Sequence, residues 1–142
     1  RKMIMWEGYC PTHMRLTPEM VQRRKAEFPE AKVIMHPEAP PATLALADEV
    51  LSTGGMCRYA KNYEGSTLIV ATEAGIIHRL RKENPKVKFV HISEQAICPD
   101  MKKIRIGDLL NSLETMSVKT TVPEDVRVKA EAPIRKMLEL SK

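Results

Sequence analysis

The run TLIVA, residues 67–71, is the feature that most constrains how this chain folds. It is apolar almost throughout and has polar neighbours on both sides, which is typical of a strand buried in a parallel sheet. KVIM at residues 32–35 and KVKFVHI at residues 86–92 also have strand character, and residues 3–6 resemble the end of a strand. Since helical patterns separate these runs, we predict an α/β fold, a three-layer sandwich with a short parallel sheet between helices.

Helices are expected between and after these strands. Thr17 is placed to cap the first, with Pro18 at its first position, and Thr72 is placed to cap another. A turn at residues 52–55 leads into a third helix. The expected helices cover residues 17–28, 42–50, 56–62, 73–84, 106–116 and about 123–140.

The composition excludes several classes of protein. No apolar run approaches the roughly 18 residues that a membrane span needs, and no signal peptide is visible, so we expect a cytoplasmic protein with no membrane partner. The formal charge is +5, with basic clusters at residues 23–25, 78–82 and 102–103. We expect these to be solvated helix faces or to attract a small anion. Nucleic acid is not expected as a partner, because the aromatic residues that stack on bases make up only 4% of the chain.

Polar residues follow the predicted strands at the edge where parallel α/β sheets bind ligands. His36 and Glu38 come after the strand at residues 32–35, and both can point into one cleft as an acid–base pair. Residues 52–55, Ser-Thr-Gly-Gly before a helix, resemble an anion cradle. The alternatives remain open at this stage: a loop histidine, a glutamate that precedes a helix, and an ordinary Ser/Thr cap.

The three cysteines do not form the framework of a secreted disulfide protein. Cys10 and Cys98 are each followed by proline, and each lies in a loop after a strand-like segment. A Cys-Pro pair ends a common ferredoxin ligand run, so a shared metal assembled from distant loops is one interpretation. Two unrelated thiols are the other. Cys57 lies within an apolar helical pattern and is expected to be a packing residue.

Five segments together carry a resemblance to a known family: MWEGYCPTH, VIMHPEAPP, STGGMCRYA, TEAGIIHRLRKENP and ICPDMKK. In this order and spacing they resemble the C-terminal half of quinolinate synthase, the NadA-type enzyme of de novo NAD biosynthesis. The resemblance extends over essentially the whole chain. It implies condensation of iminoaspartate with dihydroxyacetone phosphate to quinolinate, with these small anionic molecules as substrates.

The resemblance also implies a cofactor and a domain plan. The family uses a 4Fe–4S cluster with three cysteine ligands, and Cys10 and Cys98 match the second and third of them. Family enzymes have three similar α/β domains around a pseudo-threefold axis. Residues 1–10 would then be the end of a preceding domain, residues 11–104 one complete domain, and residues 105–142 a C-terminal helical segment that packs on the missing half.

Four further residues match or adjoin active-site positions of the family. The resemblance implies proton transfer for Glu38, and binding of substrate carboxylate, hydroxyl or phosphate groups for His36 and Thr53, with Ser52 beside them. Ala39 stands where the family usually has a cysteine that is not a cluster ligand. The N-terminal half, with the remaining ligand, is a missing partner, so this chain alone is expected to be inactive.

The sequence is also compatible with two functions of other classes. One is a non-catalytic α/β module, a truncated paralogue that binds an anionic metabolite through residues 52–55. The other is a zinc-binding domain that uses Cys10 and Cys98.

Overall fold

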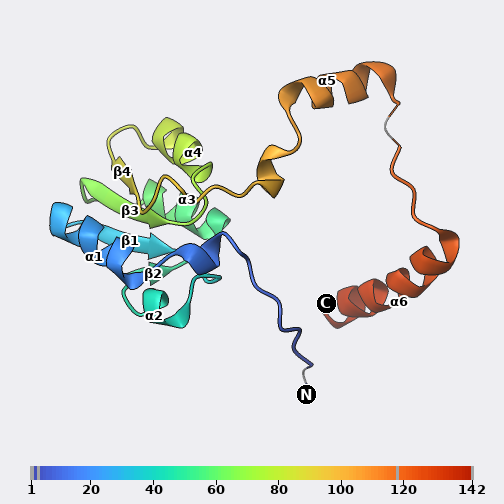
Figure 1. Cartoon of the computed structure of the whole chain (residues 1–142), viewed down its shortest axis with the longest axis horizontal. Coiled ribbons are helices and arrows are strands. Elements are labelled where there is room, and N and C mark those ends of the chain that lie inside the picture. The colour runs from blue at the N-terminus through green and yellow to red at the C-terminus, as the bar shows by residue number, and fades with distance from the viewer. Residues whose placement is uncertain (1, 3, 118, 142) are drawn as a thin grey trace. The chain divides into compact units, whose positions relative to one another are not determined.

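The structure, a computed structural model, describes residues 2, 4–117 and 119–141. The chain divides into two compact units, Arg1–Asp100 and Met101–Lys142. The first unit contains the sheet, and the described residues of the second contain two α-helices (Figure 1).

The sheet of the first unit has four parallel strands in the order β2-β1-β3-β4. The predicted strands are confirmed as β1 (Lys32–Met35), β3 (Thr67–Ala71) and β4 (Lys88–His91). The strand β2 (Glu49–Val50) lies where a helix was expected, so that prediction is wrong. Helix α2 ends at Leu44, and the chain then pairs with β1 at Glu49 and Val50, which a longer helix would not allow.

Helices cover both faces of the sheet, which confirms the predicted three layers. Helices α1 (Pro18–Glu27) and α2 (Pro41–Leu44) pack on one face, and α3 (Thr53–Lys61) and α4 (Ile76–Glu83) on the other (Figure 1). Side chains of each strand alternate between the two hydrophobic cores. The first core includes Val33, Met35, Ile69 and Ala71, and the second includes Ile34, Leu68, Val70 and the predicted packing residue Cys57.

Three local predictions are wrong. Residues 4–10 form no strand and are mostly exposed, since no neighbouring strand pairs with them; Met3 lies outside the described residues. Thr72 does not cap α4, which begins at Ile76 with Gly75 at its N-cap position. The expected turn at residues 52–55 instead contains the N-cap and first helical turn of α3.

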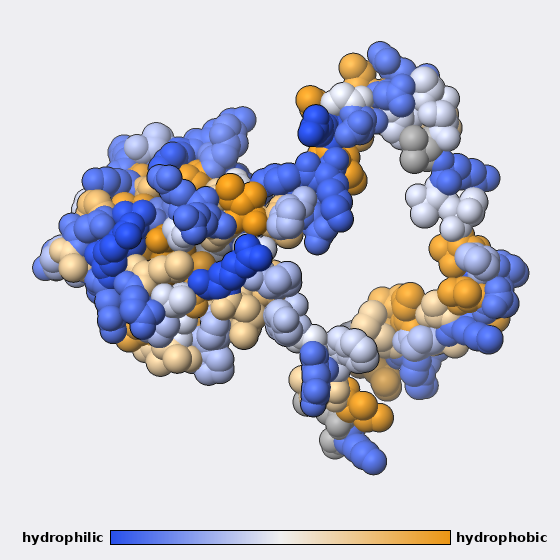
Figure 2. All heavy atoms as spheres, viewed as in Figure 1, coloured by the Kyte–Doolittle hydropathy of each residue, from blue (hydrophilic) through white to orange (hydrophobic). Residues whose placement is uncertain are grey.

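The second unit contains the two predicted C-terminal helices, α5 (Ile106–Thr115) and α6 (Glu124–Leu140). Neither helix has a buried residue among those described, and apolar side chains such as Leu110 and Ile134 are exposed. Figure 2 shows hydrophobic residues, in orange, at the surface of this unit. Neither helix is long and apolar enough to cross a membrane, and the same holds for every other described helix.

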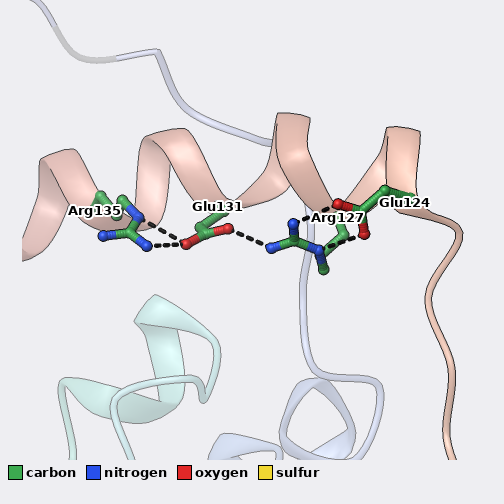
Figure 3. Close-up of polar contacts among 4 residues, drawn as sticks. All are labelled: Glu124, Arg127, Glu131 and Arg135. Carbon is green, nitrogen blue, oxygen red and sulfur yellow. Dashed lines mark hydrogen bonds and ion pairs between the residues drawn. The ribbon is translucent and has the colours of Figure 1, made fainter.

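Charged pairs along α6 connect successive turns of that helix (Figure 3). Arg127 donates to both Glu124 and Glu131, with N···O distances of 2.6 Å for the closest contact to each. Arg135 donates to Glu131 from the following turn. Solvent and salt screen exposed pairs of this kind, so they stabilise the helix only weakly and do not replace a hydrophobic core.

Candidate functional site

The order in which successive strands are added to the sheet reverses at β1. The connection after β1 leads to β2 on one side, and the connection after β2 leads to β3 on the other side of β1. The carboxyl ends of β1 and β3 therefore flank a topological switch point, where open α/β sheets bind their ligands. The residues that leave these two strands are His36 and Thr72.

His13 is the centre of the polar cluster at this point. It begins the short 3-10 helix η1 (His13–Arg15), and its side chain is buried. Its Nδ1 lies 3.1 Å from Cys10 Sγ and 2.9 Å from Glu38 Oε2. Its Nε2 lies 2.8 Å from the hydroxyl of Thr72. One imidazole thus connects a thiol, a carboxylate and the end of β3.

His36 and Glu38 approach the same imidazole from the end of β1. The rings of His36 and His13 stack with centroids 4.5 Å apart. His36 Nδ1 lies 3.6 Å from Glu38 Oε2, and the backbone N–H of His36 donates to the carbonyl of Ala71. The His36 ring is held beside the carboxylate by this stacking and by the backbone N–H of Glu38, which donates to His36 Nδ1 at 3.4 Å.

The environment of His13 favours its neutral form. Burial lowers the pKa of His13 below its ordinary value of 6.5, and the charge of His36 lowers this pKa further. Glu38 acts in the opposite direction, both by its charge and by its hydrogen bond. The net shift is downward, so His13 is mainly neutral at pH 7 and can use one ring nitrogen as an acceptor.

Thr72 and Glu73, which follow β3, connect the cluster to neighbouring parts of the fold by hydrogen bonds. The backbone carbonyl of Thr72 accepts a hydrogen bond from His91 Nε2 at 2.7 Å, which fixes the residue that contacts His13. Glu73 is buried, and its carboxylate accepts bonds from the backbone N–H groups of Gly75 and Cys98, at 2.7 and 3.4 Å. Glu73 therefore connects the end of β3 to the loop that carries Cys98.

An open pocket of about 370 Å³ gives access to the cluster. Its lining residues are Gly8, Tyr9, Cys10 and Glu38. The side chain of Glu38 is 53% exposed, whereas that of His13 is only 10% exposed. A ligand in this pocket would meet the thiol and the carboxylate first, with the imidazole behind them.

The structure brings three of the predicted site residues together: Cys10, His36 and Glu38. Cys98 is half-buried on the loop after β4. Among the described residues, the group with donor atoms within 4.8 Å of one another contains Cys10, His13 and Glu38, and Cys98 is not part of it. The sequence interpretation missed His13, although its Cys-x-x-His spacing from Cys10 was a usable signal.

Ser52 and Thr53 lie at the start of α3, after β2. Ser52 Oγ accepts a hydrogen bond from the backbone N–H of Gly55 at 3.2 Å, so Ser52 is the N-cap of the helix. Thr53 is the first helical residue, and its side chain is exposed. The capping alternative is thus confirmed for Ser52, and a ligand-binding role for either residue stays a prediction.

The cap gives a direct stability prediction for Ser52. Replacing Ser52 with alanine should lower the free energy of unfolding by about 1 kcal/mol, whereas glycine should lower it by only a few tenths. Urea denaturation followed by circular dichroism measures both. Equal losses for the two variants would show that the hydroxyl does not stabilise α3.

The fold and the site together define an α/β protein of the kind that binds ligands at the carboxyl edge of its sheet. The chain belongs to the NadA family, described as quinolinate synthetase A protein, whose family model matches residues 1–139. This is a family of enzymes.

Relatives from bacteria and archaea agree with this assignment. The chain is 51% identical over 138 residues to a quinolinate synthase of Dehalococcoides mccartyi (strain CBDB1), covering 97% of the chain and 46% of that relative. It is 46% identical over 137 residues to the quinolinate synthase of Pelobacter propionicus, covering 96% and 45%. It is 48% identical over 138 residues to quinolinate synthase 1 of Methanosarcina acetivorans, covering 97% and 45%. The chain thus spans about half the length of these curated relatives, and the expected partial resemblance is confirmed.

Proposed function

We propose that this chain is the C-terminal portion of a quinolinate synthase, which condenses iminoaspartate with dihydroxyacetone phosphate to quinolinate in de novo NAD biosynthesis. The observation that carries the proposal is the meeting of Cys10, His36 and Glu38 at the switch point of the sheet, through His13. Membership of an enzyme family supports this function over a non-catalytic anion-binding module. The cysteines of this chain are free thiols, which is typical of proteins in the reducing cytoplasm.

The residues of the chain fit part of a 4Fe–4S cluster. Cys10 and Cys98 are free, half-buried thiols on loops, and thiolates are the ligands of such clusters. Cys57 fits poorly, because its side chain is packed in the core beneath α3. Cys10 and Cys98 would supply two ligands, and the rest of the protein the third. A bound cluster with an open iron supplies a Lewis acid for substrate oxygen atoms.

Glu38 is the residue best placed to move protons during the condensation. Its carboxylate is at the pocket, where it can take a proton from a bound substrate and return it during dehydration and tautomerisation. His36, held by stacking on His13, can donate to a substrate carboxylate or hydroxyl. Thr53, with Ser52 beside it, would bind a further anionic group at the start of α3, where the helix dipole favours negative charge.

The exposed apolar faces of α5 and α6 are proposed to pack on the remainder of the whole-length protein. Leu109 and Leu113 lie on α5 and Met137 on α6, and each side chain is at least half exposed. Helices of this length gain most of their stability from such packing rather than from their own hydrogen bonds. The relatives are about twice as long as this chain, so a protein of that length has further residues from which such a surface can form.

The activity assay tests the proposal directly. Whole-length protein, reconstituted anaerobically with iron and sulfide, should form quinolinate from iminoaspartate and dihydroxyacetone phosphate. The present chain, treated identically, should form none, because it supplies only two of the three proposed cluster ligands. Liquid chromatography with mass detection measures the product. Absence of quinolinate from cluster-containing whole-length protein would refute the proposed function.

A further inference from the structure

We propose that Cys10, His13 and Glu38 bind a single divalent transition-metal ion, such as Zn²⁺, when the chain holds no cluster. One donor atom from each residue lies within 4.8 Å of the other two. This site uses His13, to which the family resemblance assigned no role, and it does not use Cys98. The inference depends on the geometry of this chain and is independent of the proposed function.

The donor set matches the ligand preferences of Zn²⁺. Thiolate, imidazole and carboxylate are its usual protein ligands, at about 2.3, 2.0–2.1 and 2.0–2.2 Å. At a tetrahedral angle, these bond lengths separate neighbouring donors by roughly 3.3–3.6 Å. The His13 nitrogen lies 3.1 Å from the Cys10 sulfur and 2.9 Å from the Glu38 oxygen. A small outward movement of the half-exposed Glu38 side chain and of the thiol admits the ion.

Thr72 supplies the supporting contact that metal-binding histidines usually have. Such histidines donate their second ring N–H to an oxygen atom, which fixes the tautomer and the ring orientation. Thr72 Oγ1 lies 2.8 Å from Nε2 of His13, on the side opposite the thiol and carboxylate. A hydroxyl both donates and accepts. Thr72 therefore accepts the Nε2 hydrogen when Nδ1 binds the ion, and donates when Nδ1 carries the hydrogen instead.

The backbone already holds two of the ligands close together. Cys10 and His13 are three residues apart, and the N–H of Met14 donates to the carbonyl of Cys10 at 3.0 Å, which closes the turn between them. The pocket beside Cys10 and Glu38 leaves the fourth position open to water or another small ligand. Three protein ligands and an open position are typical of zinc sites that can react, rather than of closed structural ones.

Binding changes the protonation of one ligand in a measurable way. The Cys10 thiol loses its proton to the solvent when its sulfur binds the ion, while His13 binds through a neutral nitrogen. Because Cys10 is also the proposed cluster ligand, the single ion and the cluster exclude each other. The two sites differ in Cys98, which the cluster needs and the single ion does not.

Anaerobic titration of the metal-free chain with Co²⁺ tests the site. A thiolate-to-cobalt charge-transfer band should appear and saturate at one ion per chain, and Zn²⁺ should then displace the cobalt. The band should vanish in Cys10→Ser, and the apparent affinity should fall at least ten-fold in Glu38→Gln. Thr72→Val, which keeps the buried shape, should weaken binding about ten-fold through loss of the supporting contact. Cys98→Ser, the matched control, should bind as the parent does.

Three results would overturn the inference: no cobalt band in the parent chain, loss of the band in Cys98→Ser, or unchanged affinity in Glu38→Gln. Glu38 is exposed, so its variant is expected to fold, and circular dichroism verifies this. Failure of the proposed function is a separate outcome. If this chain binds cobalt but the whole-length protein never assembles a cluster, the result contradicts only the proposed cluster and leaves the single-ion site standing.

Discussion

Replacing Cys98 with serine in the whole-length protein is expected to abolish the visible absorbance of the iron–sulfur cluster. In the proposed arrangement three thiolates hold the cluster, so loss of one leaves only two. A serine oxygen is a poor substitute, since iron–sulfur clusters are held by soft thiolate ligands. The loop around Cys98 should remain in place, because its backbone N–H, rather than its sulfur, is bonded to buried Glu73. The loss would therefore report ligation rather than unfolding.

Cys57→Ala is the control for this experiment. Cys57 is buried between α3 and the sheet, so alanine should reduce the stability by about 1 kcal/mol and leave the cluster intact. Anaerobic reconstitution, followed by absorbance and by iron and sulfide analysis, compares the two variants with the parent. A full cluster in Cys98→Ser would show that Cys98 is not a ligand. Only Cys10 would then remain of the two ligands proposed for this chain.

The elements that the sequence predicted best are those with a single dominant signal. Residues 67–71 are apolar except for Thr67, and a continuous apolar run of this length favours a buried strand. Helices α5 and α6 were also placed within a residue or two of their observed bounds. The strand β2 was missed because two residues carry no periodicity. Its conformation comes from pairing with β1, a contact between segments that local propensity does not encode.

The candidate site was predicted in part for a similar reason. His36 and Glu38 follow a clear strand, and the rule that ligands bind at the carboxyl edge of a parallel sheet located them. His13 precedes every described strand, so the same rule gave no reason to choose it. Thr72 was interpreted as a cap, since Ser and Thr before a helix usually are. Its contact with His13 spans 59 residues of sequence, which only the folded chain brings together.

Replacing Glu38 with glutamine is expected to leave the cluster in place and to reduce turnover about 10²–10⁴-fold, the usual contribution of a general acid–base group. The amide keeps the size of the side chain but cannot take up or return a proton. Glu38 contacts both His13 and His36, so the carboxylate is fixed at the pocket rather than free in solvent. The effect should therefore appear mainly in kcat, with a smaller change in KM.

Glu94→Gln is the matched control, because Glu94 is an exposed carboxylate on the loop after β4 and is not part of the His13 cluster. Its variant should retain near-normal turnover. Steady-state quinolinate formation, normalised to cluster content, separates a defect in chemistry from a defect in cofactor assembly. Near-normal turnover of Glu38→Gln would exclude this carboxylate from proton transfer. A loss of cluster in that variant would instead mean that Glu38 helps to hold the Cys10 thiolate through the shared imidazole.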